Sequence, residues 1–179
     1  MFSFFSKTGV KCILVCLLAA LVLAGCKTDP GFDDDHVLDP KLIASWSSFW
    51  GDGASDYDGY IITGTHVKYD SGGIIDYEGD IVYVSNFSSN AGVIIIKYDS
   101  PRTYYDGEFD NDGNWVSTGT HESSGDYTGI FYRELTSGTV EMGTAYDAEE
   151  TTPYRASAAF TKGNEGNYIW QYGVYTKDL

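Results

Sequence analysis

The sequence predicts an all-β domain, an antiparallel barrel of about eight to nine strands with one short helix near 153–161. From Lys41 onward the chain is rich in Tyr, Ile, Val, Thr and Trp, which suit the pleated surface of a sheet. Glycine-containing turn sequences, for example at 58–59, 106–107 and 137–138, divide this body into short runs. Many short strands at such spacing are typical of a sandwich or a barrel, and the spacing alone leaves both open.

The first strands are predicted from the period-two alternation of apolar residues. After an early strand that bears Trp46, strands are expected at 80–87 and 93–98, joined by a turn of hairpin length. In the first of these two, Ile81 and Tyr83 are expected to share a face. The second is apolar on both faces, so we expect a central strand that is covered on each side.

A second hairpin is expected from 127–135 and 139–146, which a short turn separates. Within 127–135, the alternation places Phe131 on one face and Ile130 on the other. A closing strand is expected at 168–176, with four large side chains on one face: Tyr168, Trp170, Tyr172 and Val174.

The segment before the closing strand breaks the alternating pattern and contains good helix formers. Thr152 can cap a helix, Pro153 suits its first position and Gly163 can end the turn. These residues predict a helix over 153–161. Alternation at 154–160 is also compatible with a strand.

The N-terminus has the layout of a bacterial secretory signal. Lys7 and Lys11 precede 13 uncharged residues, and small residues then lead to Cys26. A bilayer-spanning helix needs about 20 apolar residues, so this run is short for one, and an uncleaved anchor or a secreted form are the alternatives. The stretch 23–26 (Leu-Ala-Gly-Cys) resembles the lipobox of bacterial lipoproteins. This resemblance implies cleavage before Cys26 and acylation of that cysteine.

The signal divides the chain into a signal peptide, a lipidated cysteine with a disordered acidic tether, and a barrel domain: 1–25, 26–40 and 41–179. Cys12 and Cys16 lie in the signal, so the exported chain holds no disulfide and its own core must stabilise it. Acyl chains would attach it to the membrane. We expect a lipid-anchored monomer in the cell envelope. The outer membrane is favoured over the inner one, because Lys27 rather than Asp follows the cysteine.

The chain is strongly acidic, with a formal net charge of −15. Such a surface repels phosphate backbones and anionic lipid head groups, so we expect no nucleic-acid partner. Solubility is the simplest explanation of the acidity. Attraction of a cationic ligand or of divalent ions is the alternative.

The order of about eight strands, one helix and a closing strand resembles the lipocalin-like barrel. Lipocalins place Gly-x-Trp on their first strand, and Ala44-Ser45-Trp46 stands here with Ala in place of Gly. The phrases WSSFWGDG, GDYTGIFYREL and GNYIWQYGVYTK resemble small treponeme-type lipoproteins of unassigned activity. The second resemblance implies a fold and an envelope location rather than a reaction.

No catalytic motif stands out, since both the Gly-x-Ser-x-Gly elbow and a phosphate-binding glycine loop are missing. His66 and His121 could bind a metal with Asp or Glu across strands, but no local spacing supports this. The acidic loop 106–114 fails the EF-hand pattern, because Asn111 and Ser117 occupy its glycine and glutamate positions. A polar hairpin turn explains the loop equally well. We therefore expect no cofactor, no metal site and no enzymatic activity.

Aromatic side chains are the remaining candidates for a binding site. The chain has 15 Tyr, 9 Phe and 4 Trp, and cross-strand packing is their simplest role. An eight-stranded barrel can also hold one small ligand. We expect a small apolar or aromatic ligand in a barrel cavity, lined by residues chosen from the alternation: Trp46, Tyr83, Tyr98, Phe131, Trp170 and Tyr172. The alternatives are a surface-interaction or structural lipoprotein without a cavity, and an enzyme.

Overall fold

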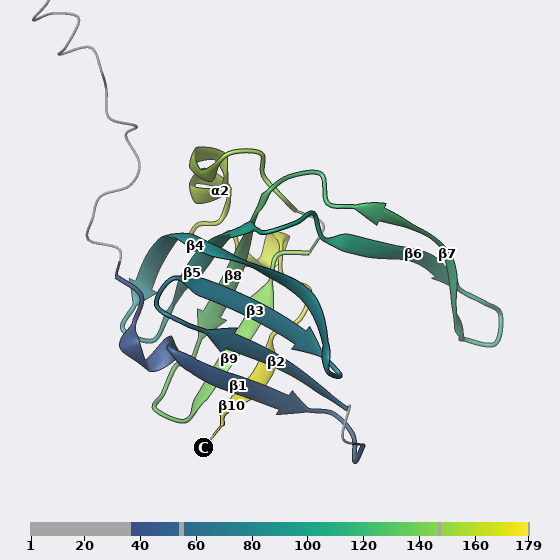
Figure 1. Cartoon of the computed structure of the whole chain (residues 1–179), viewed down its shortest axis with the longest axis horizontal. Helices are drawn as coiled ribbons and strands as arrows, with labels where there is room; N and C mark the ends of the chain where they lie inside the picture. Colours follow the sequence, from purple (N-terminus) through teal and green to yellow (C-terminus); the bar gives the residue numbers. More distant parts are fainter. Residues whose placement is uncertain (1–36, 54–55, 147, 179) are drawn as a thin grey trace, which may run out of the picture. The chain divides into compact units, whose positions relative to one another are not determined.

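The computed structural model describes residues 37–53, 56–146 and 148–178. The predicted signal peptide, Cys26 and most of the predicted tether lie outside the described residues. The fold is all-β, as predicted, and its main feature is a closed antiparallel barrel of eight strands (Figure 1). Within the described ranges, no helix is long and apolar enough to cross a bilayer.

The barrel strands follow one another around the wall almost in chain order, and β10 closes the ring by pairing with β1. Side chains alternate between the barrel interior and the outer face. The eight wall strands are β1 (Ala44–Phe49), β2 (Tyr57–Ile62), β3 (His66–Ser71), β4 (Ile74–Ser88), β5 (Ala91–Tyr98), β8 (Tyr127–Arg133), β9 (Thr139–Thr144) and β10 (Gly173–Lys177). A short 3-10 helix, η2 (Glu165–Asn167), precedes β10.

Two further strands form a separate hairpin that lies outside the barrel (Figure 1). β6 (Thr103–Phe109) and β7 (Trp115–Glu122) pair with each other and are inserted in the chain between β5 and β8. The acidic loop between them is a hairpin turn. In this turn the Asp110 carboxylate accepts hydrogen bonds from the amides of Asp112 and Asn114, at 2.9 and 2.8 Å.

The predicted helix is confirmed as α2 (Pro153–Ala159), between β9 and β10. Thr152 caps it, since its side chain accepts a hydrogen bond from the Arg155 amide at 3.2 Å. The helix packs against β4, β5 and β8, and Phe160 at its end is buried. The strand alternative for 154–160 is therefore excluded.

Apolar side chains form two cores, one on each side of the barrel wall. The interior core receives side chains from all eight wall strands. The outer core lies between α2 and the wall and contains Phe131 and Phe160. Strand β5 contributes to both cores, and its residues Val93 to Ile96 are completely buried. This confirms the prediction of a central strand that is covered on each side.

A bulge in β4 changes the face of one predicted site residue. Ile81 pairs with Ile96, but Tyr83 pairs with Ile95, so Val82 is an extra residue in β4. As a result Ile81 packs in the interior core and Tyr83 packs in the outer core. The prediction that Ile81 and Tyr83 share a face is wrong, because strict alternation does not continue across a bulge.

The N-terminal segment closes one end of the barrel. A short 3-10 helix, η1 (Pro40–Leu42), precedes β1, and Leu38 and Leu42 are buried in the interior core. The Trp46 indole Nε1 donates a hydrogen bond to the Leu42 carbonyl at 2.9 Å. Leu38 belongs to the range 26–40 that the sequence assigns to the tether, so the folded domain includes the last residues of that range.

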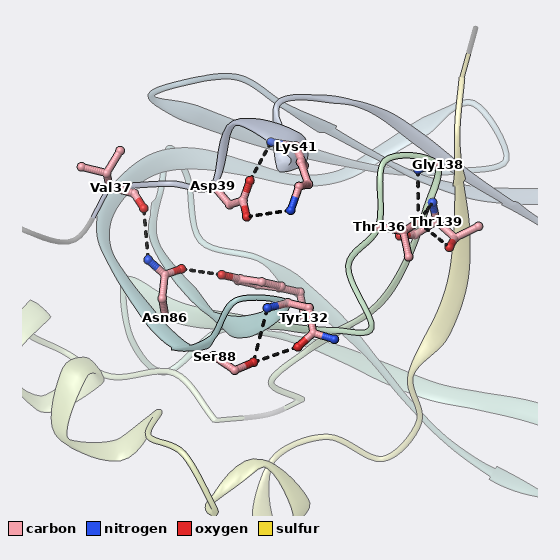
Figure 2. Close-up of polar contacts among 10 residues, drawn as sticks. Val37, Asp39, Lys41, Asn86, Ser88, Tyr132, Thr136, Gly138 and Thr139 are labelled. Atoms are coloured by element: carbon pink, nitrogen blue, oxygen red, sulfur yellow. Dashed lines mark hydrogen bonds and ion pairs between the residues drawn. The ribbon is translucent and has the colours of Figure 1, made fainter.

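Figure 2 shows the polar contacts at this closed end. The Asn86 side chain donates from Nδ2 to the carbonyl of Val37 at 3.2 Å. Its Oδ1 accepts a hydrogen bond from the Tyr132 hydroxyl at 2.6 Å. Asp39 caps η1 by accepting a hydrogen bond from the Lys41 amide at 2.9 Å. Asn86 therefore ties the entering chain to strands β4 and β8.

Replacement of Asn86 by Ala is expected to lower the free energy of unfolding by about 1–2 kcal/mol. The change removes the acceptor of the buried Tyr132 hydroxyl and the contact with Val37. Ser88→Ala is the matched control, because the Ser88 hydroxyl bonds Asn90 rather than the N-terminal segment. Urea denaturation of both variants measures the difference, and equal effects would contradict this role of Asn86.

Candidate functional site

The end of the barrel opposite η1 carries a cavity of about 380 Å³. Its lining comes from the last residues of β1, β3 and β9, the first residues of β2, β4 and β10, and the connection between β5 and β6. Cavities of several hundred Å³ are the usual size of small-molecule sites. We call this site the tyrosine mouth and define it by Tyr60, Tyr69, Tyr77, Arg102, Thr144 and Tyr175.

Strand pairing brings the four tyrosine rings of the mouth together. Tyr60 is the Cα partner of Tyr69 across β2 and β3, and Tyr69 is the partner of Tyr77 across β3 and β4. Ring centroids are 4.8 Å apart in the first pair and 5.2 Å apart in the second, which is stacked. Tyr175 meets the Tyr60 ring edge to face at 5.0 Å. The mouth therefore has a continuous aromatic lining.

Thr144 connects two of the tyrosine hydroxyls. Its Oγ1 shares hydrogen bonds with the hydroxyl of Tyr60, at 2.9 Å, and with that of Tyr77. Burial raises the pKa of Tyr60, Tyr69, Tyr77 and Tyr175 above the ordinary tyrosine value. All four side chains are therefore neutral at physiological pH, and their hydroxyls can both donate and accept hydrogen bonds.

One positive charge lies at the rim of the mouth. The Arg102 guanidinium lies over the rings of Tyr77 and Tyr104, at 4.8 and 4.7 Å from their centroids. Its Nη2 donates to Asp76 Oδ2 at 2.6 Å. Burial disfavours the charged form, but Tyr77 and Asp76 outweigh it and raise the pKa of Arg102 above its ordinary value. The charge is therefore permanent and held in a fixed position.

Polar contacts extend from Arg102 to the base of the β6–β7 hairpin. The Tyr104 hydroxyl donates a hydrogen bond to Glu149, and its ring meets that of Tyr146 edge to face at 5.6 Å. Tyr146 also lines the mouth. Among the described residues, the buried atoms Nε of Arg102 and Oε2 of Glu149 have no hydrogen-bond partner. These two atoms, at the junction of the hairpin and the barrel, could therefore still form hydrogen bonds.

A second cavity, of about 610 Å³, borders the mouth. It shares Tyr69 and Arg102 with the mouth, and Ile74, Ile75 and Tyr105 also line it. Its walls come from two barrel strands, the end of β3 and the start of β4, and from the chain that leads into β6. The mouth is lined by six strands of the ring, and for that reason we take the mouth as the candidate site.

None of the six residues nominated from the sequence lines the tyrosine mouth. Trp46 and Tyr98 lie in the interior core, as expected, but they are only 1% and 5% exposed and are packed among other side chains. Tyr83 and Phe131 lie in the outer core, on the other side of the wall. Their assignment to the interior is wrong, because alternation separates two faces without showing which one the helix covers.

Trp170 and Tyr172 are also outside the interior. Strand β10 begins at Gly173, so both residues precede it, although the sequence placed them in a strand at 168–176. The Trp170 side chain is 91% exposed. The Arg133 guanidinium lies over the Tyr172 ring at 4.1 Å from its centroid, beside an outer cavity of about 360 Å³. Neither residue can serve as an interior ligand contact.

Sequence analysis missed the tyrosines that do line the mouth. A usable signal was present. Tyr60 and Ile62 stand two positions apart in the sequence, as do Val67 and Tyr69, so each pair is expected to share one face of a strand. All four side chains pack in or against the interior core. Alternation gives the face of each tyrosine. It does not give the strand register that gathers the tyrosines at one end of the barrel.

The structure does not bring the two candidate histidines together. His66 lies on β3 in the barrel wall, with Nδ1 at 3.0 Å from Asp80 Oδ1. His121 lies on β7 in the separate hairpin, with Nδ1 at 2.8 Å from Asp106 Oδ1. A metal site that uses both histidines, one of the arrangements weighed from the sequence, is therefore not formed.

Comparison with known proteins adds no assignment, since no family model matches the chain and no curated protein or solved structure is significantly similar to it. The resemblances to lipocalins and to treponeme-type lipoproteins stay predictions. The candidate site therefore depends on its geometry alone.

Proposed function

We propose that this protein is an envelope lipoprotein that binds a small apolar or aromatic ligand in the tyrosine mouth. The observation that carries the proposal is the cavity of about 380 Å³ at one end of a closed barrel, lined by five tyrosine side chains. Small-molecule sites are concave and largely apolar, with a few polar groups that fix the orientation of the ligand. The tyrosine mouth is concave and lined by aromatic rings, and its polar groups include Thr144, Arg102 and Asp58.

The side chains of the mouth indicate how such a ligand is held. A planar ring can pack against Tyr60, Tyr69, Tyr77 and Tyr175, whose faces and edges suit offset or edge-to-face contacts. A polar substituent on the ligand can reach the tyrosine hydroxyls or Arg102 at the rim. No catalytic step is proposed, and the protein is taken as a binder or carrier.

The lipoprotein part of the proposal rests on the sequence around Cys26. Val37 is held at the closed end of the barrel by Asn86. The 10 residues from 27 to 36 can reach at most about 35 Å when extended. An anchor at Cys26 would therefore join the membrane to the closed end, and the ligand would enter from the opposite end.

Filling the mouth is expected to abolish ligand retention. Ser48 lines the mouth, so Ser48→Trp places an indole in the cavity. Native mass spectrometry of the full chain purified from its host is expected to show a bound small molecule on the wild type and none on Ser48→Trp. Thr176→Trp is the control, because Thr176 is exposed on the neighbouring strand β10 beside the interior residue Tyr175.

Two outcomes would count against ligand binding in the mouth: a wild-type protein that carries no small molecule, or equal retention by Ser48→Trp. Either result would favour the alternative, a surface-interaction lipoprotein. That alternative is supported by large exposed apolar side chains, among them Trp170, Phe49 and Phe109, which are 91%, 71% and 69% exposed.

A further inference from the structure

We propose that the outer wall of the barrel carries a zinc site formed by His66, Asp80 and Asp99. The site goes beyond the proposed ligand-binding function and shares no residue with the tyrosine mouth. It also departs from the sequence-based expectation of no metal site. The donors come from the neighbouring strands β3 and β4 and from the residue that follows β5, so no local spacing in the sequence reveals them.

Backbone pairing fixes the positions of the three side chains. His66 and Asp80 are Cα partners across β3 and β4. Asp99 directly follows β5, and its amide donates a hydrogen bond to the Glu78 carbonyl at 3.0 Å. Val67, next to His66, is buried in the interior core, so His66 projects from the outer face of the wall. A site built on paired strands is held more precisely than one built on loops.

The donor atoms of the three side chains are close enough to converge on one ion. One donor atom from each lies within 4.8 Å of the others. His66 Nδ1 is 3.0 Å from Asp80 Oδ1, and the other ring nitrogen, Nε2, is 3.9 Å from Asp99 Oδ2. Only one of the two nitrogens can bind the ion, so one aspartate side chain must rotate to bring its carboxylate to the same nitrogen. Donors that share a tetrahedral zinc ion are spaced by about 3.3 Å. The aspartate side chains are 75% and 47% exposed, so they are free to rotate by the small amount required.

Glu78 adds a third carboxylate–imidazole contact beside the site. Its Oε2 lies 3.7 Å from His66 Nε2 and 2.7 Å from Lys68 Nζ. The bond from Lys68 lowers the pKa of Glu78, so this carboxylate is ionised at neutral pH. A carboxylate next to a metal-bound imidazole orients the ring and makes it a stronger ligand. Lys68 brings a positive charge to the same place and opposes the binding of a dication.

The combination of one imidazole with carboxylates favours zinc over calcium or magnesium, which prefer oxygen donors alone. Three protein donors leave further coordination positions to water. The formal net charge of −15 also attracts cations to the surface. Both the donor set and the overall charge therefore agree with a bound divalent transition metal.

Calorimetric titration of zinc chloride into the purified full chain, in non-ionic detergent at pH 7.5, tests the proposal. We expect one saturable zinc per chain. His66→Ala and Asp80→Asn should each weaken binding by at least tenfold. Lys68→Met should tighten it, because the opposing charge is removed. Calcium should bind more weakly than zinc.

His121→Ala is the matched control, because His121 also has a carboxylate beside its Nδ1, at 2.8 Å from Asp106. The zinc affinity of the His121→Ala variant should equal that of the wild type. Circular dichroism of each variant shows that the barrel is intact. The proposal is overturned if the wild type lacks a one-to-one zinc site, if a folded His66→Ala binds as tightly, or if calcium binds more tightly. None of these outcomes affects ligand retention in the mouth.

Discussion

Raising the pH from 8 to 11 is expected to remove much of the stability of this barrel. Burial raises the pKa of Tyr60, Tyr77 and Tyr175 in the folded protein. In the unfolded chain each phenol titrates near its ordinary pKa of about 10. Above that pH the unfolded chain releases protons that the folded chain keeps, so the free energy of unfolding falls as the pH rises.

The expected loss is large. A phenol that stays neutral in the folded chain at pH 11 contributes roughly 1.4 kcal/mol to the loss, and several such side chains together contribute a few kcal/mol. Domains have a total stability of about 5–15 kcal/mol. Below pH 10 the contribution of these side chains is fully present, so stability should be flat in that range with respect to tyrosine ionisation.

Urea denaturation at pH 8, 9, 10 and 11 measures this loss. Tyr77→Phe removes one titrating group and should make the alkaline decline shallower. Tyr105→Phe is the control, because Tyr105 is 68% exposed and its replacement should leave the decline unchanged. A free energy of unfolding that stays constant up to pH 11 would show that these phenols are not held neutral by the fold.

Truncation of Trp46 to Ala is expected to lower the free energy of unfolding by about 3–5 kcal/mol. The side chain is 1% exposed in the interior core, so its removal leaves a cavity. It also removes the Nε1 donor from the Leu42 carbonyl. Trp46 lies on β1, which pairs with β10 at Lys177 and so closes the ring of strands. The change therefore weakens both the N-terminal segment that closes one end of the barrel and the pairing of β1 with β10.

Two further variants separate the parts of this effect. Trp46→Phe keeps most of the apolar volume and loses the hydrogen bond, so it should cost less than Trp46→Ala. Trp170→Ala should change stability by no more than about 0.5 kcal/mol, because Trp170 is 91% exposed. Urea denaturation of the three variants gives the comparison. Equal losses for Trp46→Ala and Trp170→Ala would contradict the assigned role of the interior core.

Much of the fold could be predicted from local sequence. The apolar run in β5 indicated a strand covered on both faces, and the structure buries Val93 to Ile96 completely. Thr152 and Pro153 indicated where the helix begins. These signals are local, because the capping bond and the alternation of side chains involve residues a few positions apart.

The candidate site could not be predicted in the same way. The face of Tyr83 depends on a bulge opposite β5, and the face of Phe131 depends on where α2 packs. The site residues Tyr77, Arg102 and Thr144 come from different strands and one connection, so only the register of the closed wall gathers them. Register and helix docking are long-range properties that one sequence does not reveal.

Closure of the barrel also separates the chain into parts that differ in their tendency to self-associate. Every strand of the wall has a hydrogen-bonded neighbour on both sides, whereas β6 and β7 in the described structure each have one free edge. A free edge offers backbone donors and acceptors to another copy of the chain, and charged side chains are a common protection against this. Asp106, Glu108 and Asp110 give the hairpin that protection. Replacing these carboxylates by uncharged side chains would favour aggregation that starts at the hairpin and leaves the barrel wall intact.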